Sequence, residues 1–262
     1  MNLSLEGRSA LVCGSTQGIG RAAAHELALL GARIVLLARN EASLAATAAA
    51  LPAVKSGPHT FLAADFSDPA TVDAAAHKAT GAGEPLHILV NNTGGPPGGP
   101  LQSASPEALL AAFHAHVICN QLLTRALVPG MKAAGFGRII NVISTSVKAP
   151  IPNLGVSNTI RGAVASWAKT LATELGASGI TVNNVLPGYT STERLASLTR
   201  TRAQASGASL DSVEADLKAS IPAARFGTPQ EIGAAIAFLA SPAAAYINGI
   251  NLPVDGGRLP TL

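Results

Sequence analysis

The feature that most constrains the fold is a glycine-rich turn near the start of the chain, residues 13–20, which reads CGSTQGIG. An apolar run typical of a β-strand, residues 9–12, precedes the turn, and a helical pattern over residues 22–30 follows it. Glycines let the backbone approach a ligand closely, and the free N–H groups at the start of a helix attract an anion. Strand, glycine turn and helix in this order predict a binding place for the pyrophosphate of a dinucleotide. The spacing differs from the usual Gly-x-Gly-x-x-Gly pattern, so the turn alone is a weak signal.

Strand-like and helix-like segments alternate along the whole chain. Helical patterns cover residues 41–51, a segment from Asp68, and residues 105–134, 158–176 and 228–239. The apolar runs that read as strands are residues 9–12, 33–37, 60–64, 87–90, 138–143, 180–185 and 249–254. Continuous apolar runs are typical of strands buried on both faces of a parallel sheet. The alternation predicts an α/β protein with a doubly wound, seven-stranded parallel sheet (Rossmann fold).

One domain spanning residues 1–262 suits this pattern, because 48% of the chain is hydrophobic and only 13% is charged. Residues 189–225 are polar and weakly helical, and we expect them to form a substrate loop or lid. In such sheets, ligands lie beyond the carboxyl ends of the strands, where the strand order reverses. The glycine and asparagine clusters of this chain follow predicted strands, so we expect them to line that edge.

Charge and cysteine content narrow the classes of partner. The net charge of +3 comes from scattered residues, which argues against nucleic acid or a membrane surface as a partner. The two cysteines, Cys13 and Cys119, lie in apolar surroundings, and no Cys/His cluster has zinc spacing, so we expect neither a disulfide nor a metal site. No apolar run reaches about 18 residues and no signal-peptide pattern is evident. We therefore expect a cytoplasmic protein.

Six motifs, in order and at the right intervals, make nearly the whole chain resemble the short-chain dehydrogenase/reductase family, in the branch that includes acyl-carrier-protein ketoreductases. They are the glycine turn, Asp65-Phe66, Asn91-Asn92-Thr93-Gly94, Pro187-Gly188 with Thr192, the run from Arg225 to Pro229, and the run from Val254 to Gly257. The resemblance implies transfer of hydride between a nicotinamide cofactor and a small carbonyl or hydroxyl compound. Relatives are usually tetramers that pair their long helices, and the two long helices here are rich in apolar residues, so we expect a homotetramer or a dimer.

The resemblance also assigns the residues that bind the cofactor. They are Gly14, Ser15, Thr16, Gln17, Gly18, Ile19, Gly20, Arg39, Asn40, Asp65, Phe66, Asn91, Thr93, Gly94, Arg161, Pro187, Gly188, Thr190 and Thr192. Physical chemistry indicates whether the cofactor carries a 2′-phosphate. An acid at the end of the second strand binds a ribose 2′-hydroxyl, whereas an arginine accommodates a 2′-phosphate. Because that strand ends in Ala38-Arg39-Asn40, with an arginine and no acid, the sequence favours NADP(H) over NAD.

The catalytic pattern of the family is altered in this chain. Family members use Asn, Ser, Tyr and Lys, with the tyrosine as the acid that protonates the carbonyl oxygen. Alignment on the fifth strand puts Ser144 at the serine position, Ser157 at that of the tyrosine, Arg161 at that of the lysine and His116 at that of the asparagine. A serine hydroxyl is a far weaker acid than a phenol of pKa about 10, and an arginine keeps its proton.

The proton must then come from another group. The candidates are water, His116 with an ordinary pKa near 6.5, or Tyr189, which follows Pro187-Gly188. Two hypotheses follow. The first is an NADP(H)-dependent oxidoreductase that resembles 3-oxoacyl reductases. The second is a nucleotide-binding protein with little or no catalytic activity that serves as a sensor or an assembly partner.

Overall fold

The computed structural model describes residues 1–81, 83 and 85–261, and in this part of the chain one parallel sheet of seven strands forms the centre of the molecule. Its order is β3-β2-β1-β4-β5-β6-β7, so the direction of winding reverses between β1 and β4. The strands are β1 (Ser9–Cys13), β2 (Arg33–Ala38), β3 (Thr60–Ala63), β4 (Ile88–Asn91), β5 (Gly137–Val142), β6 (Ile180–Pro187) and β7 (Asn251–Val254). The predicted doubly wound Rossmann fold is confirmed.

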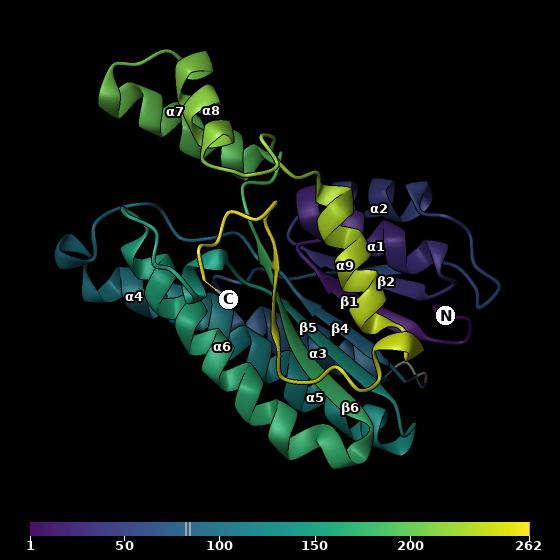
Figure 1. Ribbon diagram of the computed structural model, residues 1–262. Coiled ribbons are helices and arrows are strands. Elements are labelled where there is room, and N and C mark those ends of the chain that lie inside the picture. Colours follow the sequence, from purple (N-terminus) through teal and green to yellow (C-terminus); the bar gives the residue numbers. More distant parts are fainter. Residues whose placement is uncertain (82, 84, 262) are drawn as a thin grey trace.

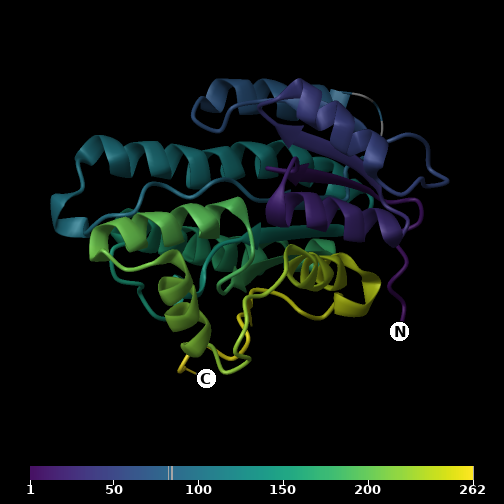
Figure 2. The same ribbon diagram turned by 90° about the horizontal axis from the view of Figure 1, so that it is seen from above.

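Helices cover both faces of the sheet (Figures 1 and 2). Helices α1, α2 and α9 cover one face of the sheet, and α3, α5 and α6 cover the other. The helices are α1 (Gly18–Leu29), α2 (Glu41–Ala50), α3 (Pro69–Gly81), α4 (Pro106–Phe113), α5 (Cys119–Ala133), α6 (Gly155–Leu175), α7 (Glu193–Ser206), α8 (Leu210–Ala219) and α9 (Pro229–Ala240). Short 3₁₀ turns occupy Leu101–Ser103, Thr145–Val147, Gly176–Ser178 and Pro242–Ala244. No helix among the described residues is long and apolar enough to cross a membrane.

Strand β1 shows why the central strands are apolar at every position. Its residues Ala10 and Val12 belong to the core beneath α1 and α9, whereas Leu11 and Cys13 belong to the core beneath α3 and α5. Successive side chains of a strand point to opposite faces, so a strand between two helical layers needs an apolar residue at each position. Strands β4 and β5 are buried along their whole length as well, so the carboxyl ends of β1, β4 and β5 lie between the same two helical layers.

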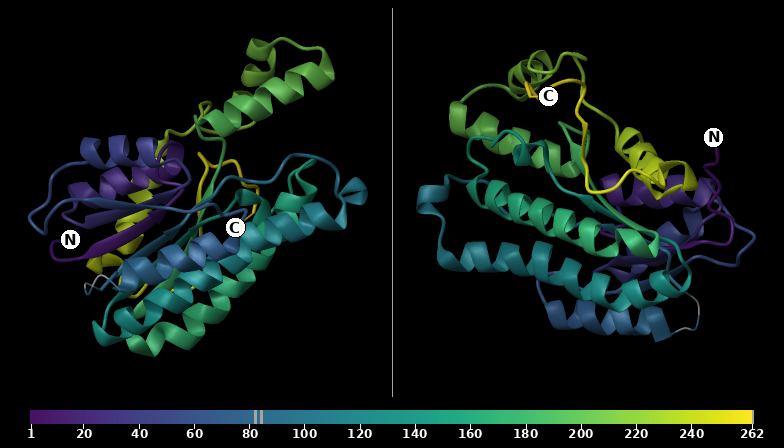
Figure 3. Two further views of the ribbon diagram at one scale, coloured as in Figure 1. Left: turned by 180° about the vertical axis from the view of Figure 1, so that it is seen from behind. Right: turned by 60° about the horizontal axis from the view of Figure 1, so that its bottom comes forward.

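The segment expected to be a weakly helical lid folds as two complete helices. Thr192 caps α7 through its side chain, Ser209 caps α8 in the same way, and Gly207 between them has a positive φ of 70°. These two helices project from the body of the molecule above the edge of the sheet (Figures 1 and 3). Their shared apolar cluster contains Ala203, Val213 and Leu217, with Tyr189 and Phe226 packed against it. The α7–α8 hairpin therefore has a small core of its own.

Candidate functional site

The glycine turn between β1 and α1 is held by an asparagine from the end of β4. The Asn92 side-chain amide donates to the carbonyl of Cys13 at 3.2 Å and to that of Gly14 at 3.3 Å. A Cβ on Gly14 would lie 2.7 Å from the Asn92 amide nitrogen, and a Cβ on Gly20 would overlap the Gly14 carbonyl. Gly14 also has a φ of 56°, which is costly for other residues. Neither position can accept a side chain without moving the backbone.

The start of α1 leaves its N–H groups available to a ligand. Its N-cap residue, Gln17, makes no side-chain capping bond, and its first turn contains no acid. In contrast, α9 begins with a complete capping box formed by Thr228 and Glu231. Free N–H groups and the positive end of the helix dipole favour a bound anion. The turn lies where the strand order of the sheet reverses. Thr192 approaches the backbone of Gly18, and its methyl group would lie 3.3 Å from a Cβ built on that glycine. This arrangement fits a pyrophosphate.

Arg39 extends from the end of β2 beside the glycine turn. The Ser15 hydroxyl accepts the Leu37 N–H at 3.1 Å, which ties the turn to β2 next to this arginine. The pKa of Asp65 is lowered by hydrogen bonds from Ser67 and, less strongly, by the charge of Arg39, so these two side chains are near one another. Arg39 itself is exposed. An exposed guanidinium at this edge suits the 2′-phosphate of NADP.

Other predicted cofactor residues use their side chains for structure. Asn40 caps α2 by accepting the Ser43 N–H at 2.8 Å. The ring of Phe66 is buried in the core beneath α3 and α5. The Ser15 side chain is fully buried. Only the backbone of Ser15 and Phe66 is then free to face a cofactor.

Asn91 belongs to a row of four asparagines that crosses the sheet from β4 to β7. Asn91 donates to Asn141 at 2.8 Å, Asn141 to Asn184 at 2.9 Å, and Asn184 to Asn251 at 2.8 Å. These residues are in register, so each amide faces the next strand. Amides that bond to one another in this way lock the pairing of the strands, and in the described part of the chain the buried Oδ1 of Asn91 at the end of the row has no partner. The Asn91 side-chain nitrogen therefore has a role within the sheet, and the contact of Asn91 with a cofactor remains a prediction.

The predicted reaction residues gather at the end of β5. The Ser144 hydroxyl accepts the N–H of Ser146 at 3.1 Å, just beyond the strand. Arg161, from α6, is buried and donates through Nη1 to the Val142 carbonyl at 2.8 Å. Ser157 is half-buried one helical turn before Arg161, so it is on the same side of α6. The structure thus brings Ser144 and Arg161 to one edge of the sheet, with Ser157 alongside.

His116 reaches the same edge from a π-helical turn, His114–Ile118, between α4 and α5. Such a turn carries an extra residue and is often found at functional sites. The ring is buried, and the Gly94 carbonyl accepts a hydrogen bond from it. Burial, and then the charge of Arg161, lower the pKa of His116 to about 2. The expectation of an acid with a pKa near 6.5 is wrong, because a group so easily deprotonated is a neutral imidazole at physiological pH.

Tyr189 is engaged at the base of the α7–α8 hairpin. Arg258 lies over its ring, with Cζ 4.4 Å from the centroid, and donates to its hydroxyl at 3.2 Å. The ring also packs edge-on against Phe226. These contacts indicate a packing role for Tyr189 at the hinge of the hairpin.

The comparisons with known proteins agree with this geometry. The family model described as Enoyl-(Acyl carrier protein) reductase matches residues 14–258. 3-Oxoacyl-(acyl-carrier-protein) reductase FabG of Vibrio cholerae is 34% identical over 257 residues, covering 97% of this chain and 98% of that protein. The chain belongs to the short-chain dehydrogenase/reductase family.

Solved structures of short-chain reductases superpose closely on this chain. L-Sorbose reductase from Gluconobacter frateurii, in complex with NADPH and L-sorbose, matches with a TM-score of 0.93 and 32% identity over 100% of both chains. YwfH, an NADPH-dependent reductase involved in bacilysin biosynthesis, matches with a TM-score of 0.90 and 28% identity over 97% of this chain and 99% of that one. The fold is thus shared over its whole length with reductases of this family.

Asn92 is a residue of this short-chain dehydrogenase/reductase site whose role the sequence did not predict. The motif Asn91-Asn92 was recognised, but the cofactor set included only its first member. Which of two adjacent asparagines faces the glycine turn depends on the pleat of β4, because successive side chains point to opposite faces. The close approach of Asn92 to Gly14 is the structural reason for the glycine at that position.

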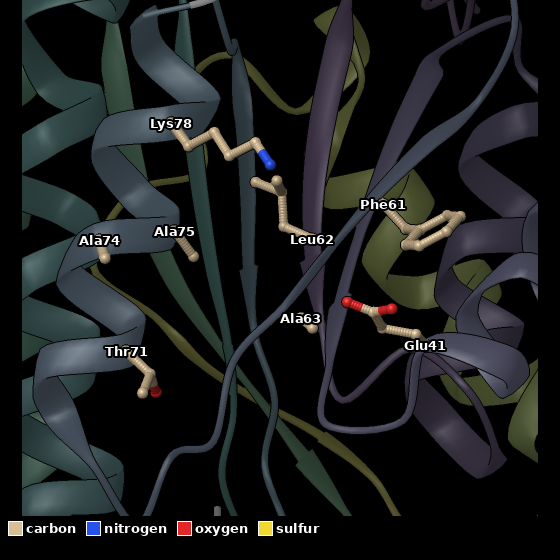
Figure 4. Close-up of a pocket in the computed structure, with 8 residues that line it drawn as sticks. All are labelled: Glu41, Phe61, Leu62, Ala63, Thr71, Ala74, Ala75 and Lys78. Carbon is tan, nitrogen blue, oxygen red and sulfur yellow. The ribbon is translucent and has the colours of Figure 1, made fainter.

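A cavity of about 400 Å³ lies away from this site at the outer edge of the sheet (Figure 4). Figure 4 shows Glu41 and Lys78 on either side of Leu62 and Ala63 from the edge strand β3. Its lining does not include the glycine turn or the residues at the end of β5. Among the described residues, no group of three or more His, Cys, Asp or Glu side chains could hold a metal ion.

Proposed function

We propose that this short-chain dehydrogenase/reductase is an NADP(H)-dependent oxidoreductase that reduces a carbonyl, or oxidises a hydroxyl, of a small molecule, in the manner of 3-oxoacyl reductases. The observation that carries the proposal is the glycine turn closed by Asn92 at the reversal point of the sheet. Backbone this tightly held, at the start of an uncapped helix, suits a dinucleotide. The similarity to FabG and to the NADPH complex of L-sorbose reductase supports the same function.

The chain provides a place for each part of the cofactor. The turn from Gly14 to Gly20 would hold the pyrophosphate, with Thr192 covering it, and Arg39 would hold the 2′-phosphate. When bound, the nicotinamide supplies the hydride for reduction or accepts it in oxidation. The predicted contacts of Thr93, Gly94, Pro187, Gly188 and Thr190 remain proposals on the same edge, as do those of Thr16, Gln17 and Ile19 in the turn.

Side chains at the end of β5 would handle the reacting oxygen. The Ser144 hydroxyl can donate to a carbonyl oxygen, and Arg161 places a fixed positive charge beside the same strand end. Burial lowers the pKa of Arg161 to about 10, so it stays charged at neutral pH and stabilises negative charge rather than transferring a proton. Ser157 is too weak an acid to replace a phenol. We assign the proton to a water molecule, because His116 is neutral and Tyr189 is engaged by Arg258.

Cellular location and assembly belong to the same proposal. We propose a cytoplasmic homotetramer or dimer paired through its long helices. Leu110 and Phe113 on α4 support this, because 57% and 38% of their surfaces are exposed although both are large and apolar. Light scattering at micromolar concentration tests the assembly, and a monomer would contradict it.

The test of function is a titration with NADPH and NADH followed by a carbonyl panel. We expect cofactor fluorescence to show tighter binding of NADPH, and NADPH oxidation with at least one aldehyde or ketone. The second hypothesis, a nucleotide-binding sensor, is not favoured, since the relatives are reductases. Binding of NADPH with no turnover of any carbonyl would revive that hypothesis, and binding of neither cofactor would refute both.

A further inference from the structure

Two arginines converge on one point beside the reaction residues. Arg194, in the first turn of α7, donates through Nη2 to the Pro96 carbonyl at 2.7 Å. A Cβ built on Gly95 would lie 3.5 Å from Nη2 of Arg194 and 3.9 Å from Nη2 of Arg161. The two guanidiniums therefore face the same stretch of backbone, one from the body of the molecule and one from the α7–α8 hairpin.

Neither arginine has an acidic partner in the part of the chain that the structure describes. The ion pairs found there join other residues. The pKa of Arg161 is lowered to about 10 by burial and then by the positive charge of Arg194 itself. Burial lowers the pKa of Arg194 as well. His116, the other titratable group facing Arg161, is neutral. Among the described residues, the site thus holds two positive charges and no negative one.

Arg161 is buried and Arg194 is exposed, and an uncompensated buried cation such as Arg161 is costly, so a ligand that carries negative charge would stabilise this arrangement. The cofactor's phosphates have their own places, at the start of α1 and beside Arg39. The two arginines lie instead between the loop after β4, the end of β5 and the hairpin, on the side of Ser144. A guanidinium offers parallel N–H donors that match the two oxygens of a carboxylate.

We propose that Arg161 and Arg194 bind a carboxylate of the substrate, which makes the substrate class short 2-oxo or 3-oxo acids and their hydroxy counterparts. The inference rests on the proposed function for the identity of the reacting carbonyl. Arg161 is bonded to Val142, two residues before Ser144, so a carboxylate at Arg161 sets a carbonyl one or two carbons away near the Ser144 hydroxyl. Arg194 adds its charge from the hairpin and ties the hairpin to Pro96.

The first test compares each acid with its neutral ester. Phenylpyruvate and methyl phenylpyruvate, and acetoacetate and ethyl acetoacetate, are assayed with NADPH at low salt. The better acid should have a kcat/KM at least about tenfold above that of its ester, as expected for a charge-assisted hydrogen-bonded pair. Esters reduced as well as or better than both acids would overturn the inference and leave the proposed function intact.

The second test changes Arg194, which is on the surface helix and can be removed with little risk to folding. In Arg194→Ala the KM for the better acid should rise about 10- to 100-fold, with less than about a threefold change for its ester. Arg200→Ala is the matched control, because Arg200 is on the same helix but is paired with Glu193 at 2.6 Å. A matching rise in the Kd of NADPH for Arg194→Ala would show that the arginine binds the cofactor, and would overturn the inference.

A third measurement does not depend on turnover. Calorimetry compares phenylacetate with phenylacetamide as probes of the complex with NADP⁺. Phenylacetate should bind more tightly, by about tenfold or more, and its affinity should fall in Arg194→Ala and with rising salt. Equal affinity of the two probes would overturn the anion site. If the carboxylate binds but no carbonyl is reduced, the proposed function fails while the anion site stands.

Discussion

The carboxyl ends of the strands form the edge of the sheet where we expect the ligand, and the two ends of this edge are built in different ways. At the end formed by β1, β4 and α1, backbone atoms pack so closely that Gly14 and Gly20 can carry no side chain. At the end formed by β5, α6 and α7, the edge is made by side chains, namely Ser144, Arg161 and Arg194 with His116 behind them. A backbone cradle tolerates few substitutions, whereas a set of side chains can be replaced one by one on the same scaffold. A closely packed glycine turn can therefore occur together with Ser157 and Arg161, at the positions that the resemblance assigns to a tyrosine and a lysine.

The largest expected effect tests the backbone end. In Gly20→Ala the added methyl overlaps the Gly14 carbonyl, and we expect a loss of about 3 kcal/mol in stability and about a 100-fold rise in the Kd of NADPH. Urea unfolding measures the loss of stability, and cofactor fluorescence measures the Kd of NADPH. Gly162→Ala is the control, since a Cβ there meets nothing within 4 Å on α6 and should stabilise the helix slightly. Normal NADPH binding by Gly20→Ala would remove the contrast between the two ends.

The next effect tests the burial of His116 at the side-chain end. Its pKa is about 2 in the folded protein and about 6.5 in the unfolded chain. The unfolded chain therefore binds the extra proton between these values, so stability is full above about pH 6.5 and falls by about 1.4 kcal/mol per pH unit below it. Between pH 7 and pH 5 the wild type should lose about 2 kcal/mol more than His116→Asn. His114→Asn, an exposed neighbour in the same turn, should behave as wild type. An equal loss in the wild type and His116→Asn would show that the ring is not buried as a neutral group.

A smaller effect tests the choice of cofactor. Because Arg39 is exposed at the end of β2, Arg39→Asp exchanges a phosphate ligand for a charge that repels phosphate. The ratio of NADH to NADPH dissociation constants should fall by at least about tenfold and the preference should reverse. Arg21→Asp, on the exposed side of α1, provides a change of equal charge as a control. Equal affinities of the wild type for the two cofactors would mean that Arg39 makes no phosphate contact.

The smallest expected effect tests whether the side-chain end can be exchanged. Ser157→Tyr with Arg161→Lys restores a phenol and an ammonium one helical turn apart, and reductive kcat with a neutral ketone should rise about fivefold. Ser157→Tyr alone should do less, because its ring enters a space shaped for serine. A double variant that binds NADPH but reduces no carbonyl would indicate that the rest of this end is not built for such chemistry.

Local patterns in the chain were enough to predict the fold and the glycine turn between β1 and α1. The alternation of apolar strands with helices, and the glycines after the first strand, are written in short segments, because hydrophobic periodicity and backbone freedom act over a few residues. The predicted elements were found within a few residues of their expected ends. For residues 189–225, weak apolar periodicity concealed two helices, which begin after the side-chain caps Thr192 and Ser209.

Tertiary structure alone decided how the site residues act on one another. Asn92 holds Gly14 from 78 residues away, and Arg194 reaches Pro96 across 98 residues. The pKa of His116 depends on burial and on Arg161, which lies on a different helix. A sequence pattern shows which groups are present. The desolvation of a group and its interaction with nearby charges depend instead on distances in space, and these distances are set by how separate helices and strands pack. The type of fold and the glycine turn could therefore be predicted from the sequence, whereas the neutral imidazole and the paired arginines required the folded chain.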